Sequence, residues 1–127
     1  MGLGAALAGV SAGALAMLPQ HRRALAAAQI TTLVATGSYV ATALRTGDRR
    51  RIARETTAAA AGTALAHTAA SVAPRTLGPL LAAHGLYDLA LERIDPEVLP
   101  TPWYAPFCAA YDVTLGLALV ALLAEQD

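Results

Sequence analysis

Charged residues are spaced along this chain so that long apolar stretches lie between them. Residues 1–20 and 24–44 contain no charged residue, and in residues 56–73 only His67 can ionise. A helix needs about 20 residues to cross the hydrocarbon of a bilayer, with a usual range of about 17–25. The apolar segments fit this range and lack the charged stripe that a helix in a soluble bundle carries. The pattern therefore predicts membrane-spanning helices.

Prolines and charges divide the chain into about five predicted spans. These cover residues 3–18, 24–44, 56–73, 76–92 and 105–124. Pro19, Pro74 and the cluster of Pro96, Pro100, Pro102 and Pro106 mark ends of these segments, because proline interrupts the backbone hydrogen-bond ladder. Only Pro74 and Arg75 separate the third span from the fourth, which predicts a tight antiparallel hairpin. We expect an all-α, polytopic transmembrane helical bundle that forms a single domain over residues 1–127.

Composition agrees with a membrane location. Charged residues make up 14% of the chain, compared with about 25% in a typical soluble domain. Every basic residue is arginine, and alanine is abundant, a usage that suggests a bacterial source. The formal net charge is zero, so no nucleic-acid partner is expected. We predict a multi-pass protein of the bacterial inner membrane, with the lipid bilayer as its main partner.

The distribution of arginine predicts the orientation in the membrane. Residues 45–55 form the most basic interval between predicted spans, and basic connections remain on the cytoplasmic side of a membrane. This interval is therefore expected to be a cytoplasmic loop. With five spans, the N-terminus lies on the same side.

Small residues recur at every fourth position in the first and third predicted spans. Such spacing lets helix backbones approach closely in lipid, either within one chain or between chains. A homo-oligomer that associates through these faces is therefore an expectation that the sequence leaves open. The residues are Ala5, Gly9 and Gly13 in the first span, and Ala58, Gly62, Ala66 and Ala70 in the third.

Three ionisable residues inside the last two predicted spans give the strongest functional signal. His84 and Asp88 lie in the fourth span, and Asp112 lies in the fifth. An aspartate at the centre of a membrane costs about 2.5–3.5 kcal/mol on insertion scales. Such residues are rare in hydrocarbon and usually have a partner or a function.

The helix register predicts which of these residues meet. If the last two spans are antiparallel, His84 lies at the depth of Asp112, and Asp88 lies at the depth of Cys108. His84 and Asp88 are also four residues apart and share a helix face. We therefore predict a buried polar cluster of His84, Asp88, Cys108 and Asp112. Tyr87, Tyr111 and His67 are candidates for the side chains around it.

Several kinds of chemistry fit this residue set. A histidine beside carboxylates can bind and release protons, so a proton- or solute-handling or binding module is the leading interpretation. A membrane-embedded enzyme and a purely structural or partner-binding protein are the alternatives. No cofactor is predicted, but His84, Asp88 and Asp112 are the ligands for a divalent metal if one binds. The absence of an HExxH motif and of a second histidine near His84 weighs against a metal.

The last third of the chain resembles a group of small uncharacterised bacterial multi-span membrane proteins. Their pattern is H-G-L-W-D, a short loop, and then W-Y-x-P-F-C-x-x-Y-D, which residues 84–88 and 103–112 follow closely. Tyr87 stands where the pattern has tryptophan, and the paired histidines that often follow the first motif are absent here. The resemblance implies a polar site and a multi-span topology without implying a reaction.

Overall fold

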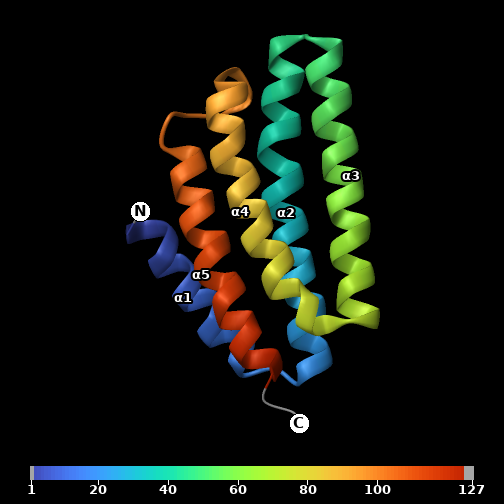
Figure 1. Cartoon of the computed structure of the whole chain (residues 1–127), viewed down its shortest axis with the longest axis vertical. Coiled ribbons are helices and arrows are strands. Elements are labelled where there is room, and N and C mark those ends of the chain that lie inside the picture. Colours follow the sequence, from blue (N-terminus) through green and yellow to red (C-terminus); the bar gives the residue numbers. More distant parts are fainter. Residues whose placement is uncertain (1, 125–127) are drawn as a thin grey trace.

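The computed structural model describes residues 2–124, apart from the side chain of Ala35, and all regular structure in that range is helical. The five helices run side by side (Figure 1). Two short 3₁₀ turns, η1 and η2, connect α3 to α4 and α4 to α5. The all-α prediction is confirmed. The helices are α1 (Gly2–Ala16), α2 (Gln20–Thr46), α3 (Arg49–Val72), α4 (Leu77–Ile94) and α5 (Tyr104–Ala124), with η1 at Pro74–Thr76 and η2 at Pro96–Val98.

The predicted loop over residues 45–55 is wrong. Only Gly47 and Asp48 separate α2 from α3, and the arginines of this interval lie in the helices on either side. Gly47 has a φ of 69°, a left-handed conformation that glycine adopts without steric cost. The Asp48 carboxylate then accepts a hydrogen bond from the backbone N–H of Arg50 at 2.8 Å and caps α3. Two residues reverse the chain, and arginine is a good helix former, so both helices extend into the basic interval.

Close glycine contacts bring α4 and α5 together. These two helices share the largest interface in the described chain, and α1 packs on α5. A Cβ added to Gly116 would lie 2.6 Å from the Gly78 carbonyl oxygen, and one added to Gly78 would lie 2.5 Å from the Gly116 carbonyl oxygen. Side chains are therefore excluded at both positions. Leu77 and Leu81 of α4 and Leu115 of α5 are buried in the core around this crossing.

Helices α2 and α3 form a separate hairpin that contacts the other three helices much less than its own members contact each other. Ion pairs attach its tip to the connection between α4 and α5. Arg51 Nη2 lies 3.1 Å from Asp95 Oδ1, and Arg54 Nη2 lies 2.7 Å from Asp95 Oδ2. We call this end of the bundle, which contains residues 45–55 and 93–99, the Arg-rich end.

Arg23 ties the helices together at the opposite end. Its guanidinium donates hydrogen bonds to the carbonyl oxygens of Ala16 at 2.8 Å and Leu18 at 2.6 Å, just where α1 ends. It also donates to the carbonyl oxygen of Leu122, in the last turn of α5, at 3.0 Å. A cation placed at helix C-termini satisfies free carbonyls and interacts favourably with the helix dipoles.

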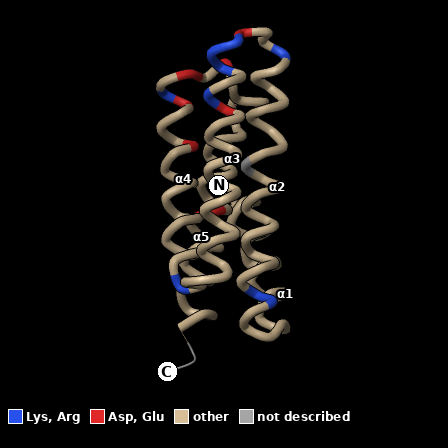
Figure 2. The backbone as a smooth tube through the Cα atoms, turned by 90° about the vertical axis from the view of Figure 1, so that its right-hand side faces the viewer, with Lys and Arg blue, Asp and Glu red and all other residues tan. Residues whose placement is uncertain are grey.

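Two helices are long and apolar enough to cross a membrane by length and composition. They are α2 and α5, with mean hydropathies of 1.3 and 2.0, while the apolar helix α1 is shorter. Figure 2 shows that charged residues gather at the two ends of the bundle and that few lie between. Large apolar side chains such as Val10, Leu33 and Leu117 are exposed along its sides. The structure thus supports two of the roughly five predicted spans by these criteria.

Candidate functional site

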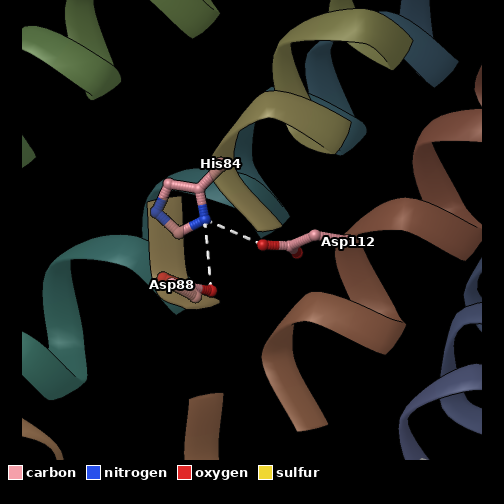
Figure 3. A group of neighbouring side chains, drawn as sticks. All are labelled: His84, Asp88 and Asp112. Carbon is pink, nitrogen blue, oxygen red and sulfur yellow. Dashed lines mark hydrogen bonds and ion pairs between the residues drawn. The ribbon is translucent and has the colours of Figure 1, made fainter. Parts of the chain in front are cut away.

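His84 of α4 and Asp112 of α5 meet between the two helices (Figure 3). His84 Nδ1 lies 2.8 Å from Asp112 Oδ2, within hydrogen-bond distance, as the register argument predicts. Gly85 makes this approach easier, because a Cβ there would lie only 3.2 Å from both the Ala109 carbonyl oxygen and the Asp112 Cβ. The small residue next to His84 thus brings the two helices close enough for the side chains to bond.

Asp88 lies one turn along α4 from His84 and is 0% exposed. Its Oδ1 accepts a hydrogen bond from the Tyr39 hydroxyl at 2.9 Å. Its Oδ2 lies 3.7 Å from His84 Nδ1 and has no hydrogen-bond partner among the described atoms. One donor atom from each of His84, Asp88 and Asp112 lies within 4.8 Å of the others. We call these three side chains the His–Asp–Asp cluster.

Tyr39 of α2 is part of the site, although the sequence analysis does not single it out. Its ring also packs edge-on against Tyr104, with centroids 5.6 Å apart, and the Tyr104 hydroxyl donates to Ser38 Oγ. The available signal is that Tyr39 shares a helical face with Gln29, Thr32 and Thr36 in the second predicted span. Nothing in the sequence says which neighbouring helix that face contacts.

Cys108 does not belong to the cluster in the way the sequence predicts. It is buried at 1% exposure, but Asp88 turns its hydrogen-bonding oxygen to Tyr39. Cys108 is also not among the described residues whose donor atoms lie within 4.8 Å of one another, which are His84, Asp88 and Asp112. The Tyr39 hydroxyl, from a third helix, makes the contact with Asp88 that the depth argument assigns to Cys108.

The three side chains expected around the cluster lie in different places. Tyr87 is beside it, with its ring centroid 6.2 Å from that of His84. Tyr111 points to α1, where its hydroxyl lies 2.9 Å from Ser11 Oγ. His67 is exposed on α3. Only Tyr87 is thus placed to influence the cluster directly.

A third buried acid, Glu55, lies near the site and was not predicted from the sequence. It is 2% exposed on α3, and its Oε1 lies 2.7 Å from Arg54 Nε. Its position inside the basic interval at 45–55 made it look like a residue of a solvated loop. Glu55, Tyr87 and His84 line a cleft of about 160 Å³ between α3 and α4, which we call the Glu55 cleft.

The His–Asp–Asp cluster can hold a metal ion. An imidazole nitrogen and two carboxylate oxygens are donors that divalent transition metals accept. The same arrangement can also hold a proton between the imidazole and a carboxylate. Either cation reduces the cost of placing two carboxylates in an interior that solvates them poorly.

Comparisons of the chain with family models, with curated proteins and with solved structures found no match. The resemblance of residues 84–112 to small bacterial membrane proteins therefore stays a prediction.

Proposed function

We propose that the chain is a multi-pass membrane protein that binds a divalent transition-metal ion as a solute at the His–Asp–Asp cluster. The observation that carries this proposal is the unpartnered Oδ2 of Asp88, fully buried and 3.7 Å from His84 Nδ1. The membrane location, the metal and the role in solute handling are each argued below.

The membrane location is supported by the way polar and apolar groups are distributed. Most charges lie at the two ends of the bundle (Figure 2), while α2 and α5 are long and apolar. Large apolar side chains stay exposed along the sides, where a soluble protein rarely leaves so extensive an apolar surface. Lipid is the solvent that suits this surface.

Arginine usage supports an orientation with the Arg-rich end in the cytoplasm. Six arginines lie at that end, at positions 45, 49, 50, 51, 54 and 93, and three lie at the other, at positions 22, 23 and 75. The positive-inside rule then puts the Arg-rich end inside. Arg23 does not oppose this orientation strongly, because it has a structural task in capping α1 and α5. The arginine-only usage and the resemblance both favour the bacterial inner membrane.

The geometry of the donors supports a metal. Bonds from zinc to histidine nitrogen or carboxylate oxygen are about 2.1 Å long, so two donors on one tetrahedral ion lie about 3.4 Å apart. His84 Nδ1 lies 2.8 Å from Asp112 Oδ2 and 3.7 Å from Asp88 Oδ2. These separations lie on either side of that value, and all three donor atoms lie within 4.8 Å of one another, so side-chain movements of about an ångström would place them on one ion.

The unpartnered Oδ2 of Asp88 supports a bound ligand, because a purely structural hydrogen-bond network would be expected to satisfy this oxygen. A buried acceptor without a hydrogen bond costs about 1–3 kcal/mol, and more when it is charged. Tyr39 satisfies Oδ1 of Asp88, whereas Oδ2 faces His84 at 3.7 Å without a hydrogen bond. A bound cation satisfies this oxygen and neutralises the carboxylates at the same time.

Two features favour a metal ion that is bound and released as a solute over a metal ion that stays bound for catalysis. The cluster lies between helices in the apolar body of the bundle, and His84 keeps 22% of its side chain exposed. Only His84 of the three is thus open to an arriving or departing ion. The membrane-enzyme hypothesis predicts a metal that stays bound through turnover, so exchange of the ion distinguishes the two.

Equilibrium binding of Zn²⁺ to the purified protein in lipid nanodiscs tests the proposal. We expect one ion per chain and release of protons on binding, because the ligands must be deprotonated. Loss of a ligating residue should weaken binding more than about a hundredfold, since even outer partners of metal ligands contribute about 10–100-fold. Asp88→Asn and His84→Gln should both show this loss. Each variant is checked for folding by its helical circular dichroism.

His67→Gln is the matched control, because His67 is an exposed histidine on α3 and lies outside the cluster. It should bind Zn²⁺ as the wild type does. A folded wild-type protein that binds no Zn²⁺ overturns the proposal, and so does binding that survives Asp88→Asn and disappears with His67→Gln. Titration of the His84 ring without any metal binding also overturns it and favours a cluster that holds only a proton.

A further inference from the structure

The groove between α3 and α4 leads to His84 of the His–Asp–Asp cluster. These helices contact each other little, and in Figure 1 they diverge above the η1 turn that joins them. The wall that α3 presents to the Glu55 cleft is made of Ala58, Ala59 and Gly62. Such small side chains leave room for a ligand where larger ones would close the groove.

Two clefts in this groove meet at His84. The Glu55 cleft extends toward the Arg-rich end, and a second cleft of about 210 Å³ lies beside it. Gly62 and His84 line both. We call the second one the Thr63 cleft. A single water needs only about 10–15 Å³ of such space, so both clefts are large enough for water, and Glu55, His84 and Tyr87 supply polar groups in the first.

Polar groups along the groove lack protein partners. Thr32 and Thr63 line the Thr63 cleft, and the hydroxyl oxygen of each is buried without a hydrogen bond among the described atoms. Buried hydroxyls are normally satisfied by protein or by ordered water. Each oxygen is closed to solvent in this conformation, so the threonine side chain must rotate toward the cleft before its hydroxyl can bond a water there.

Glu55 stands at the other end of the groove. Its carboxylate is buried, lies against Tyr87, and is held by Arg54, which is itself bound to Asp95 at 2.7 Å. The Glu55 cleft joins it to His84. This carboxylate places negative charge at the cleft, where it favours cations over anions, although Arg54 at 2.7 Å offsets part of that charge.

We infer that the groove between α3 and α4 is a hydrated path along which the metal ion reaches the cluster from the Arg-rich end, with Glu55 as the carboxylate at its entrance. This inference rests on the proposed function for the identity of the ion. The path itself is tested independently of metal binding.

Cysteine labelling in lipid vesicles tests whether water fills the groove. Gly62→Cys places a thiol between the two clefts, and nothing lies within 4 Å of a Cβ at this position, so the fold should tolerate it. A membrane-impermeant trimethylammonium thiosulfonate reagent reacts with thiols in water and not with thiols in lipid. We expect it to modify Gly62→Cys from the Arg-rich side at a rate that peptide mass spectrometry follows.

Gly37→Cys is the matched control. Gly37 is also exposed with open space at its Cβ, but it lies on α2, outside both clefts, and about one turn nearer the Arg-rich end by hairpin register. Depth alone would make it the more reactive site. We expect Gly62→Cys to react at least about ten times faster, as a water-filled groove requires. The native Cys108, buried at 1% exposure, should stay unmodified in both proteins.

Glu55→Gln tests the entrance. In the Gly62→Cys background it should reduce the preference for the cationic reagent over an anionic sulfonate reagent by several-fold, because the attracting charge is gone. Glu97→Gln removes an exposed acid from the same end and should leave the preference unchanged.

Three results would overturn the inference. Gly62→Cys could react no faster than Gly37→Cys, it could react only from the side opposite the Arg-rich end, or the preference for the cationic reagent could survive Glu55→Gln. Failure of Zn²⁺ binding with the labelling pattern intact overturns the proposed function alone and leaves a hydrated groove in place.

Discussion

The Tyr39 hydroxyl donates a hydrogen bond of 2.9 Å to Asp88 Oδ1, and this bond joins the α2–α3 hairpin to the His–Asp–Asp cluster. Both residues are buried, and their helices contact each other only slightly elsewhere. The bond therefore has two effects. It holds the hairpin against α4, and it leaves Oδ2 as the oxygen of Asp88 that faces His84.

Removing the Tyr39 hydroxyl should destabilise the bundle. In Tyr39→Phe, the buried Asp88 Oδ1 loses the hydrogen bond from the Tyr39 hydroxyl, which should cost about 1–3 kcal/mol. Tyr111→Phe is the control, because Tyr111 bonds the neutral Ser11 hydroxyl instead of a carboxylate, and a neutral pair contributes about 0.5–1.5 kcal/mol. Unfolding in mixed micelles measures both. If Tyr39→Phe lowers the free energy of unfolding no more than Tyr111→Phe does, the contact with the Asp88 carboxylate adds no stability beyond that of a neutral hydrogen bond.

A single methyl group at the crossing of α4 and α5 should disturb the fold. In Gly116→Ala the new Cβ would lie 2.6 Å from the Gly78 carbonyl oxygen, so the helices must separate, at a cost of about 1–3 kcal/mol. Gly62→Ala is the matched control. Nothing lies within 4 Å of its new Cβ, and replacing a helical glycine should gain about 0.5–1 kcal/mol. The unfolding temperature should fall in Gly116→Ala and rise in Gly62→Ala. Equal shifts in the two variants would contradict the close crossing of α4 and α5.

Arg54 should stabilise the fold through its ion pair with the buried Glu55. Arg54→Gln leaves Glu55 without its partner at 2.7 Å, and a hydrogen bond to a charged group contributes about 1.5–3 kcal/mol. Adding Glu55→Gln should recover most of this loss, because the unpaired charge is then gone. A double-mutant cycle on the midpoint of unfolding measures the coupling. Additive effects would mean that the two side chains act independently.

Acid should weaken the cap of α3 at the tip of the hairpin. Hydrogen bonds from the backbone N–H groups of Arg50 and Arg51 hold the pKa of the Asp48 carboxyl below its ordinary value of 3.8. Because the folded-state pKa is depressed, the stabilisation is complete above the ordinary value and is lost as pH falls through the lower folded-state value. Wild type should thus lose more stability between about pH 5 and about pH 3 than Asp48→Asn, which caps without titrating.

Circular dichroism of α-helix melting at each pH measures this difference. Asp48→Ala serves as the second comparison, because it lacks a capping group at every pH and should be less stable than Asp48→Asn even at neutral pH. Parallel pH profiles for wild type and Asp48→Asn would contradict the role of the ionised carboxylate in the cap.

The pattern of apolar and polar residues along the chain is enough to predict the helices and the pairing of His84 with Asp112. Apolar runs bounded by proline and arginine predict the helices of the structure, and antiparallel register places His84 opposite Asp112, at an observed 2.8 Å. This works because helical periodicity and a short connection restrict the contacts of neighbouring helices. It fails at residues 45–55, where the basic residues look like a loop and the structure shows that two residues make the turn.

The remaining contacts of the site depend on which helices pack together across long sequence separations. Periodicity gives the polar face of each helix but not the helix that the face meets, so nothing in the sequence joins Tyr39 to Asp88 or turns Tyr111 toward Ser11. Packing of the α2–α3 hairpin makes the first contact, and packing of α1 on α5 makes the second. Burial of Glu55 has the same origin, since the partner surface that covers it comes from distant parts of the chain.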